Sequence, residues 1–153
     1  ALNIALISVA YHWQLVLAAV DVQKQAKLNF YARAQGWDDL GRQLKPLLQA
    51  HPEAVLVADN RTLLAHMLYE VRDLKPAAAS WNPAGIASDH YKLTTDLRPW
   101  VGRDAVLIVE DPVGEEFTRR FAASEQLATL QAPLPGGAAR TMNVYLLHDF
   151  KGY

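Results

Sequence analysis

The chain has 153 residues, of which 51% are hydrophobic, and this length and composition suit one domain with a sizeable core. Its 15 basic and 16 acidic residues leave a formal net charge of -1, so no basic excess predicts binding to nucleic acid. There is no cysteine, which excludes disulfides, thiolate metal sites and cysteine nucleophiles.

The first 20 residues contain no Asp, Glu, Lys or Arg. Two apolar stretches, 4–10 and 15–20, together with the residues between them are about as long as a helix that crosses a bilayer. No basic residue precedes them, which argues against a signal peptide. Two interpretations stay open: a buried helix of a soluble domain, or the end of a membrane helix, in which the polar residues at 11–14 would be costly. We therefore expect an apolar helix and linker at 1–35 and a soluble α/β domain at 36–153.

A helix is predicted after Gly36, with Asp38 as its N-cap. Its buried stripe consists of leucines at helical spacing, which are Leu40, Leu44, Leu47 and Leu48. Pro46 should kink the last turn because proline removes a backbone hydrogen bond. His51 and Pro52 should end the helix.

Three short apolar runs predict strands at 54–58, 77–81 and 105–109. The first run lacks polar alternation, so it should be covered on both faces. Asp59 or Asn60 should cap the helix that follows it. The buried stripe of that helix is predicted to be Leu64, Met67, Leu68 and Val71.

Residues 82–97 carry proline, glycine and mixed polarity, so we expect a loop that includes one helical turn. Asp111 and Pro112 predict the start of a further helix, with the acid at the N-cap and proline at the first helical position. Runs at 127–134 and 141–148 should pair as an edge hairpin. The order predicts an α/β fold, a three-layer sandwich with a mainly parallel sheet, an antiparallel C-terminal hairpin and an N-terminal helix.

The usual catalytic and cofactor motifs are missing. No glycine lies in 58–63, so neither a dinucleotide fingerprint nor a phosphate loop follows the first strand. The histidines show no paired ligand spacing, and no serine lies in a Gly-x-Ser-x-Gly context. His66 and Glu70 lie four residues apart, but an exposed helix pair explains them better than a ligand pair. We expect no metal, no cofactor and no catalytic residue in this chain.

Polar or aromatic residues follow each of the three predicted parallel strands. Ligands of open α/β sheets bind at the carboxyl ends of strands, so these residues would surround any cleft. With two residues of the long loop, the candidates are Asp59, Asn60, Trp81, Asn82, His90, Tyr91, Glu110 and Asp111. Ordinary capping and loop packing is the competing explanation, because a fold does not fix a function.

Short landmarks follow one another in order between residues 36 and 109. They are Gly36-Trp37 with Leu40, Val55-Leu56-Val57, Leu64 with Leu68-Tyr69, Trp81, His90-Tyr91, and Gly102-Arg103-Asp104 followed by Ala105 to Val109. This order resembles the soluble C-terminal region of bacterial membrane glycosyltransferases of the dolichyl-phosphate-mannose protein mannosyltransferase type, which include aminoarabinose transferase-like proteins. The apolar start would then be the end of a final membrane helix.

The resemblance implies a function for the parent protein. Such proteins transfer a sugar from a polyprenyl-phosphate donor to an acceptor on the periplasmic side, and their catalytic acids lie in the membrane part. No catalytic residue can therefore be assigned to a position in this chain. The implied location is the bacterial inner membrane, with this domain facing the periplasm. The implied partners are the membrane part of the same polypeptide and a glycan or lipid-linked acceptor.

Three functional hypotheses follow. The first is an extracytoplasmic accessory domain of such a glycosyltransferase. The second is a stand-alone soluble α/β module that binds a sugar or nucleotide at the strand ends. The third is a small enzyme that uses Glu110 or Asp111 as a base.

Overall fold

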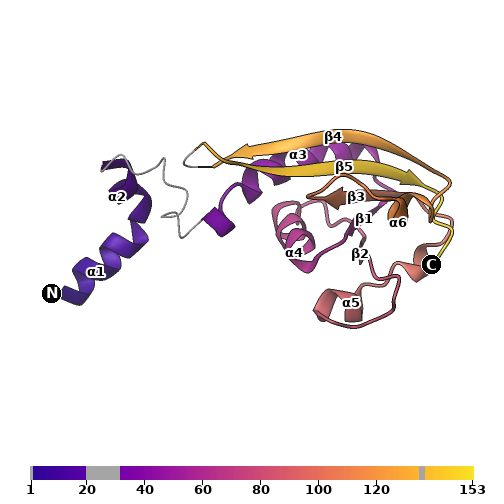
Figure 1. Ribbon diagram of the computed structural model, residues 1–153, viewed down its shortest axis with the longest axis horizontal. Helices are drawn as coiled ribbons and strands as arrows, with labels where there is room; N and C mark the ends of the chain where they lie inside the picture. The colour runs from indigo at the N-terminus through magenta and orange to yellow at the C-terminus, as the bar shows by residue number, and fades with distance from the viewer. Residues whose placement is uncertain (1, 20–31, 135–136) are drawn as a thin grey trace. The chain divides into compact units, whose positions relative to one another are not determined.

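The computed structural model describes residues 2–19, 32–134 and 137–153 (Figure 1). The chain divides into two compact units. The N-terminal unit consists of Ala1–Gly36 and Pro133–Arg140, and the main unit consists of Trp37–Ala132 and Thr141–Tyr153.

The N-terminal unit contains α1 (Leu2–Tyr11), α2 (Trp13–Ala19) and the 3-10 helix η3 (Ala32–Ala34). No described residue of α1 is buried, and its large hydrophobic side chains are from 45% exposed at Val9 to 83% exposed at Tyr11. Of the helices in the described part of the chain, none is both long enough and apolar enough to cross a membrane. Most of the linker expected before residue 35 lies outside the described residues.

A five-stranded sheet runs in the order β2 (Ala78–Ser80), β1 (Val55–Ala58), β3 (Ala105–Val109), β5 (Ala139–His148) and β4 (Ala123–Pro133). Strand β1 is parallel to both β2 and β3, whereas β5 is antiparallel to β3. Figure 1 shows β4 and β5 running in opposite directions as a long hairpin. The α/β class, the parallel core and the antiparallel C-terminal strands are therefore confirmed.

Two connections join the three parallel strands, and they run across the sheet in opposite directions, from β1 to β2 and from β2 past β1 to β3. Helix α4 (Arg61–Glu70) joins β1 to β2, and α5 (His90–Thr94) with the 3-10 helix η4 (Arg98–Trp100) joins β2 to β3. Because such connections are right-handed, they cover opposite faces of the sheet. The buried residues of α4 belong to one core, and Leu97, which precedes η4, belongs to the other, whereas Tyr91 of α5 packs against the α4 core.

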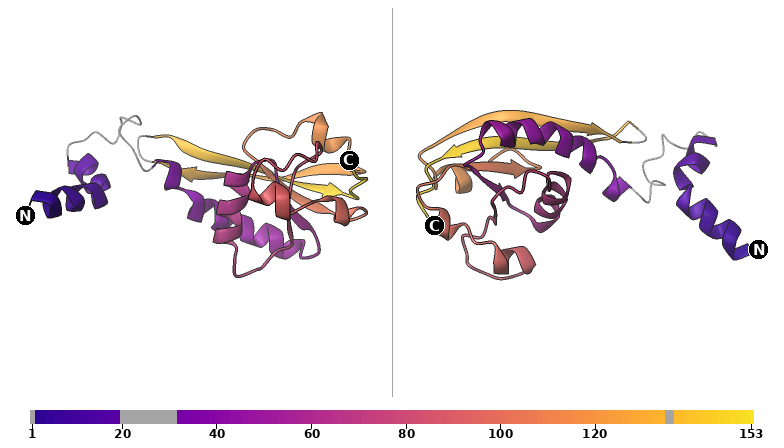
Figure 2. Two further views of the ribbon diagram at one scale, coloured as in Figure 1. Left: turned by 90° about the horizontal axis from the view of Figure 1, so that it is seen from below. Right: turned by 180° about the vertical axis from the view of Figure 1, so that it is seen from behind.

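Each face of the sheet therefore has its own apolar core. One core is formed with α3 (Trp37–Ala50) and α4, and Figure 2 shows α3 lying along the β4–β5 hairpin when the molecule is seen from behind. The other core contains the aromatic side chains Trp81, Phe117, Phe121 and Phe150. Strand β5 contributes Met142, Val144 and Leu146 to the first core and Tyr145 and Leu147 to the second, as the alternation predicts.

The predicted start of α3 is wrong. The helix begins at Trp37, so Asp38 lies in the first turn rather than at the N-cap. Trp37 is only 4% exposed and stacks on His66 with 4.1 Å between ring centroids, so packing draws it into the helix. The helix also continues through Pro46 to Ala50, because buried leucines on both sides of the proline hold the last turns against the sheet.

The helix predicted at Asp111 is also wrong. Residues 111–114 are irregular, and α6 (Glu115–Thr118) begins after Gly114 as its N-cap. Side chains of β5 hold this loop, because Asn143 Nδ2 donates to the Glu110 carbonyl at 3.1 Å and the Tyr145 hydroxyl accepts from the Val113 N–H at 3.3 Å. These contacts join residues more than thirty positions apart in sequence, so local capping rules miss them.

Candidate functional site

The carboxyl ends of β1 and β3 meet at the point where the chain turns to opposite faces of the sheet. Such a switch point is where open α/β sheets usually bind ligands. Asp59 follows β1, and Asn60 Nδ2 donates to Asp59 Oδ1 at 2.9 Å. Asn60 Oδ1 accepts from the Leu63 N–H at 2.9 Å, which confirms Asn60 as the N-cap of α4.

Electrostatics single out Asp59 within this group. Burial is the largest influence and raises the pKa of Asp59 above its ordinary value, and the negative charge of Asp111 adds to the rise. The hydrogen bond from Asn60 acts in the opposite direction but is outweighed. The structure thus brings Asp59, Asn60 and Asp111 into one electrostatic neighbourhood, in which a carboxylate is partly desolvated.

The residues after β2, in contrast to Asp59, are held by packing and hydrogen bonds within the fold. Trp81 is 7% exposed and lies in the aromatic core, with its ring centroid 4.5 Å from that of Phe117 and 5.1 Å from that of Tyr153. The Asn82 N–H donates to the Tyr153 hydroxyl at 3.0 Å, and Asn82 Oδ1 accepts from the Ile86 N–H at 3.2 Å. These groups shape the chain after β2, and Trp81 offers little surface to a ligand.

The two loop candidates lie on α5. His90 is exposed, its ring is 5.9 Å from that of Tyr91, and Asp89 caps the helix by accepting from the Lys92 N–H at 3.0 Å. Tyr91 packs against the core on the α3 side, whereas Trp81 lies in the core on the opposite face. The eight predicted residues therefore do not form a single group.

Sequence reasoning missed a polar cluster beside Glu110. Asn143 is 8% exposed and faces Val109 of β3 in the sheet register. Its Oδ1 accepts from the Thr129 hydroxyl at 2.9 Å and from Gln126 Nε2 at 3.4 Å. The available signal was an amide among the apolar residues of strand β5, and such a buried amide needs partners.

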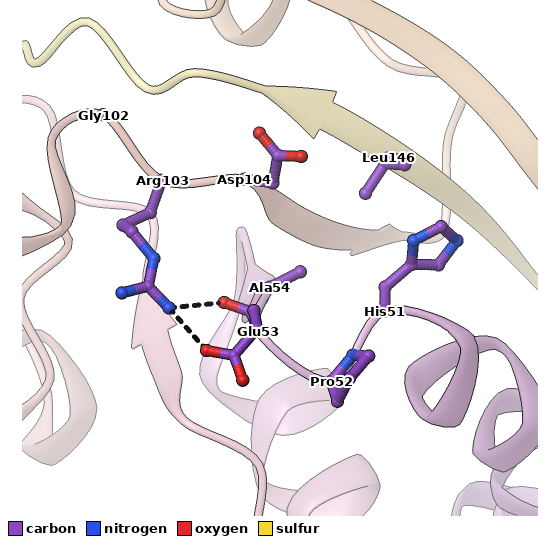
Figure 3. A pocket seen from close by; sticks show the side chains of 8 residues that line it. All are labelled: His51, Pro52, Glu53, Ala54, Gly102, Arg103, Asp104 and Leu146. Atoms are coloured by element: carbon purple, nitrogen blue, oxygen red, sulfur yellow. Dashed lines mark hydrogen bonds and ion pairs between the residues drawn. The ribbon is translucent and has the colours of Figure 1, made fainter.

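A cavity of about 290 Å³ lies at the opposite end of the sheet, before β1 and β3 (Figure 3). Its lining consists of His51, Pro52, Glu53, Ala54, Gly102, Arg103, Asp104 and Leu146. Arg103 Nη2 donates to the Glu53 carbonyl at 2.9 Å and to its carboxylate at 3.2 Å. A neighbouring hollow of about 220 Å³ is lined by Leu48, Leu74 and Pro76, and it shares His51, Pro52 and Ala54 with the first.

Asp104 joins the start of β3 to the end of β5. Its Oδ1 accepts from the Asp149 N–H at 2.9 Å, and its Oδ2 lies 3.0 Å from His148 Nδ1. Burial acts to raise the pKa of Asp104, but the hydrogen bonds from Asp149 and His148 outweigh it, so the pKa lies below its ordinary value. Of the charged groups that line this cavity, Arg103 and Glu53 thus bond each other, whereas Asp104 is bonded by two residues outside the lining.

Neither end of the sheet has the geometry of a metal centre. In residues 2–19, 32–134 and 137–153, no three side chains of His, Cys, Asp or Glu are grouped so that they could hold a metal ion. The ring of His66, a residue considered above as a metal ligand together with Glu70, stacks on the ring of Trp37. What the carboxyl edge offers is hydrogen bonding by carboxylate and amide groups, which is suited to a polyhydroxylated ligand.

Comparison with family models, with curated proteins and with solved structures gave no match. The family resemblance of residues 36–109 therefore stays a prediction from the sequence.

Proposed function

We propose that this chain is an extracytoplasmic accessory domain of a bacterial membrane glycosyltransferase that uses a polyprenyl-phosphate sugar donor. The landmarks of the resemblance include the central strands β1 and β3 and the helices α3 and α4. In this proposal the membrane part of the same polypeptide carries the catalytic residues and the main unit faces the periplasm.

The surface of α1 is the observation that carries this proposal. A helix that packs on a protein buries one apolar stripe and leaves the rest polar. Helix α1 has no charged residue, and Ile4, Leu6 and Ile7 are all more than half exposed. Apolar side chains on all sides suit surroundings that are apolar on all sides, which is what lipid and membrane helices provide.

The accessory role assigned to the main unit is contact with the glycan or lipid-linked acceptor. Asp59 and Asp111 offer carboxylate oxygens to sugar hydroxyls at the carboxyl edge, and Asn60 holds the Asp59 carboxylate by a hydrogen bond.

The reading frame upstream of the codon for Ala1 tests the proposal most directly. We expect it to encode many apolar spans and an acidic first extracytoplasmic loop. We also expect the isolated chain to transfer no sugar from a polyprenyl-phosphate donor to any acceptor. A frame without membrane spans, or transfer by the isolated chain, contradicts the proposal.

The second candidate is a stand-alone ligand-binding module, and the cavity of about 290 Å³ before β1 and β3 favours it. A ligand that binds only the folded state raises the melting temperature, because it adds a stabilisation that grows with the logarithm of its concentration over Kd. A thermal-shift screen of monosaccharides and nucleotides would detect such binding. A hit that Glu53→Gln weakens would favour this candidate over the first.

A further inference from the structure

The two edges of the sheet differ in how they are covered. At the β2 edge the strand has only three residues, and the chain that follows lies beside it. The Ser80 N–H donates to the Thr95 carbonyl at 3.0 Å, and Ser80 forms a parallel bridge with Asp96. The chain thus supplies its own neighbour to this edge.

The β4 edge has no such cover within the main unit. Strand β4 is 11 residues long and its neighbour in the sheet is β5 alone. The side chain of Gln43 reaches the Gln131 carbonyl at 2.9 Å, but the main unit shows no backbone segment beside β4 on the far side from β5. A long open edge exposes unpaired N–H and C=O groups that can pair with another strand.

The sequence of β4 does little to prevent such pairing. Proteins usually protect an open edge with charged residues, proline or a short strand. Within β4 the only charged residue is Glu125, and Pro133 stands at the very end. Glu125, Thr129 and Gln131 are all exposed, so the middle of the strand is accessible.

We propose that β4 pairs antiparallel with β4 of a second copy of this chain, so that the sheet continues across a two-fold axis. A pairing centred on Ala128 sets Leu127 of each copy opposite Thr129 of the other. It also sets Glu125 opposite Gln131, so that like charges do not meet. In a two-fold interface the same surface of each copy contacts its counterpart. The β4 edge of one copy would therefore pair with the β4 edge of the other, and a single contact would cover both open edges.

A second copy fits this edge better than a foreign peptide does. Domains that capture a peptide by strand addition recognise its side chains in pockets beside the edge. The two cavities described above lie near the amino ends of β1 and β3 and are lined by no residue of β4. The β4 edge therefore offers backbone pairing with a strand that carries one charge, at Glu125, and neither of these two cavities lies beside it to select a peptide sequence. This inference does not depend on the glycosyltransferase proposal.

The mass of the whole chain in a mild detergent, which covers α1, tests the pairing. We expect sedimentation equilibrium to give twice the chain mass of 17.0 kDa. Thr129→Lys, which puts a charge on the edge, should raise the dimer dissociation constant by about tenfold or more. Thr62→Lys, an exposed change on α4, should leave it unchanged. A monomer in the unchanged chain, or a dimer that Thr129→Lys leaves intact, overturns the proposal.

A crosslinking test avoids the added charge. The chain has no native cysteine, so a single introduced cysteine is the only thiol that can react. Ala128→Cys should give a disulfide-linked or bismaleimide-linked dimer in high yield, since the two copies of residue 128 lie opposite each other on the axis. Thr62→Cys should stay monomeric under the same conditions. Equal crosslinking of the two variants would mean random collision and would overturn the pairing even if Thr129→Lys failed to fold.

Discussion

Asp59 stands at the end of β1, where burial and the charge of Asp111 both oppose its ionised form. A carboxylate whose pKa is raised at the end of a parallel strand is a candidate for ligand contact, and this is the ground on which Asp59 enters the proposed function. Asn60 and Asp104 show the opposite case, since their polar atoms are used within the fold. At this scale, contacts within the fold account for the polar atoms of Asn60 and Asp104, whereas the pKa of Asp59 is raised by its surroundings.

Replacing Asp59 by Asn should increase the free energy of unfolding at neutral pH. An acid whose pKa is raised by folding contributes stability below its unfolded value, here 3.8, and loses that contribution as the pH rises through the folded value. The gain from Asn should therefore disappear in acid. Urea unfolding near neutral pH and at about pH 3 measures both. The exposed Asp38→Asn serves as control, and a loss of stability in Asp59→Asn at neutral pH would contradict this account.

Asp104 should behave in the reverse manner. Its pKa is lowered, so its contribution to stability is present above the unfolded value of 3.8 and is lost as the pH falls through the folded value. Asp104→Asn should lower the free energy of unfolding at neutral pH by about 1 kcal/mol, since the site is half exposed. Asp149→Asn keeps the N–H that bonds to Asp104 and should change little. Chemical unfolding across pH compares the two variants.

At the scale of elements, α3 and α4 pack closely because Gly41 has no side chain. A Cβ at that position would collide with Cβ of Glu70. Asn60 in turn sets the start of α4, and β5 side chains set the late start of α6. The elements are thus positioned by a few side chains rather than by propensity alone.

Gly41→Ala should destabilise the fold although alanine is the better helix former. Alanine gains about 1 kcal/mol in helix propensity over glycine, whereas overpacking costs about 1–3 kcal/mol. We expect a net loss, measured as a lower urea midpoint. Gln49→Ala, on the exposed side of the same helix, should leave the midpoint nearly unchanged. A higher midpoint in Gly41→Ala would show that α3 and α4 can separate without loss.

Asn60→Ala should cost about 1 kcal/mol, because the Leu63 N–H at the start of α4 loses its acceptor. Asn60→Ser can restore the cap and should recover most of the loss. Thermal unfolding of the three proteins ranks them. Equal melting temperatures for the alanine and serine variants would mean that the cap contributes nothing.

Over the whole molecule, the features that the sequence predicts correctly are those that depend on the pattern of neighbouring residues. The strands at 54–58 and 105–109, the cap at Asn60 and the C-terminal hairpin are all found. The irregular stretch after Glu110 and the pairing of Thr129 with Asn143 depend on contacts between distant segments. For the same reason the cavity between His51 and Asp104, which draws on three separate segments, could not be predicted.

The strand order also governs the timing of folding during synthesis. Strand β5 is the last strand made, yet it lies between β3 and β4 in the sheet. As the chain leaves the ribosome, β1, β2 and β3 can pair while β4, already complete, has no neighbour to join. Strand β4 therefore waits until β5 has emerged, and Phe150 then adds its ring to the aromatic core. For that interval the nascent chain displays a long unpaired strand, which makes translation the stage at which two neighbouring chains meet most readily.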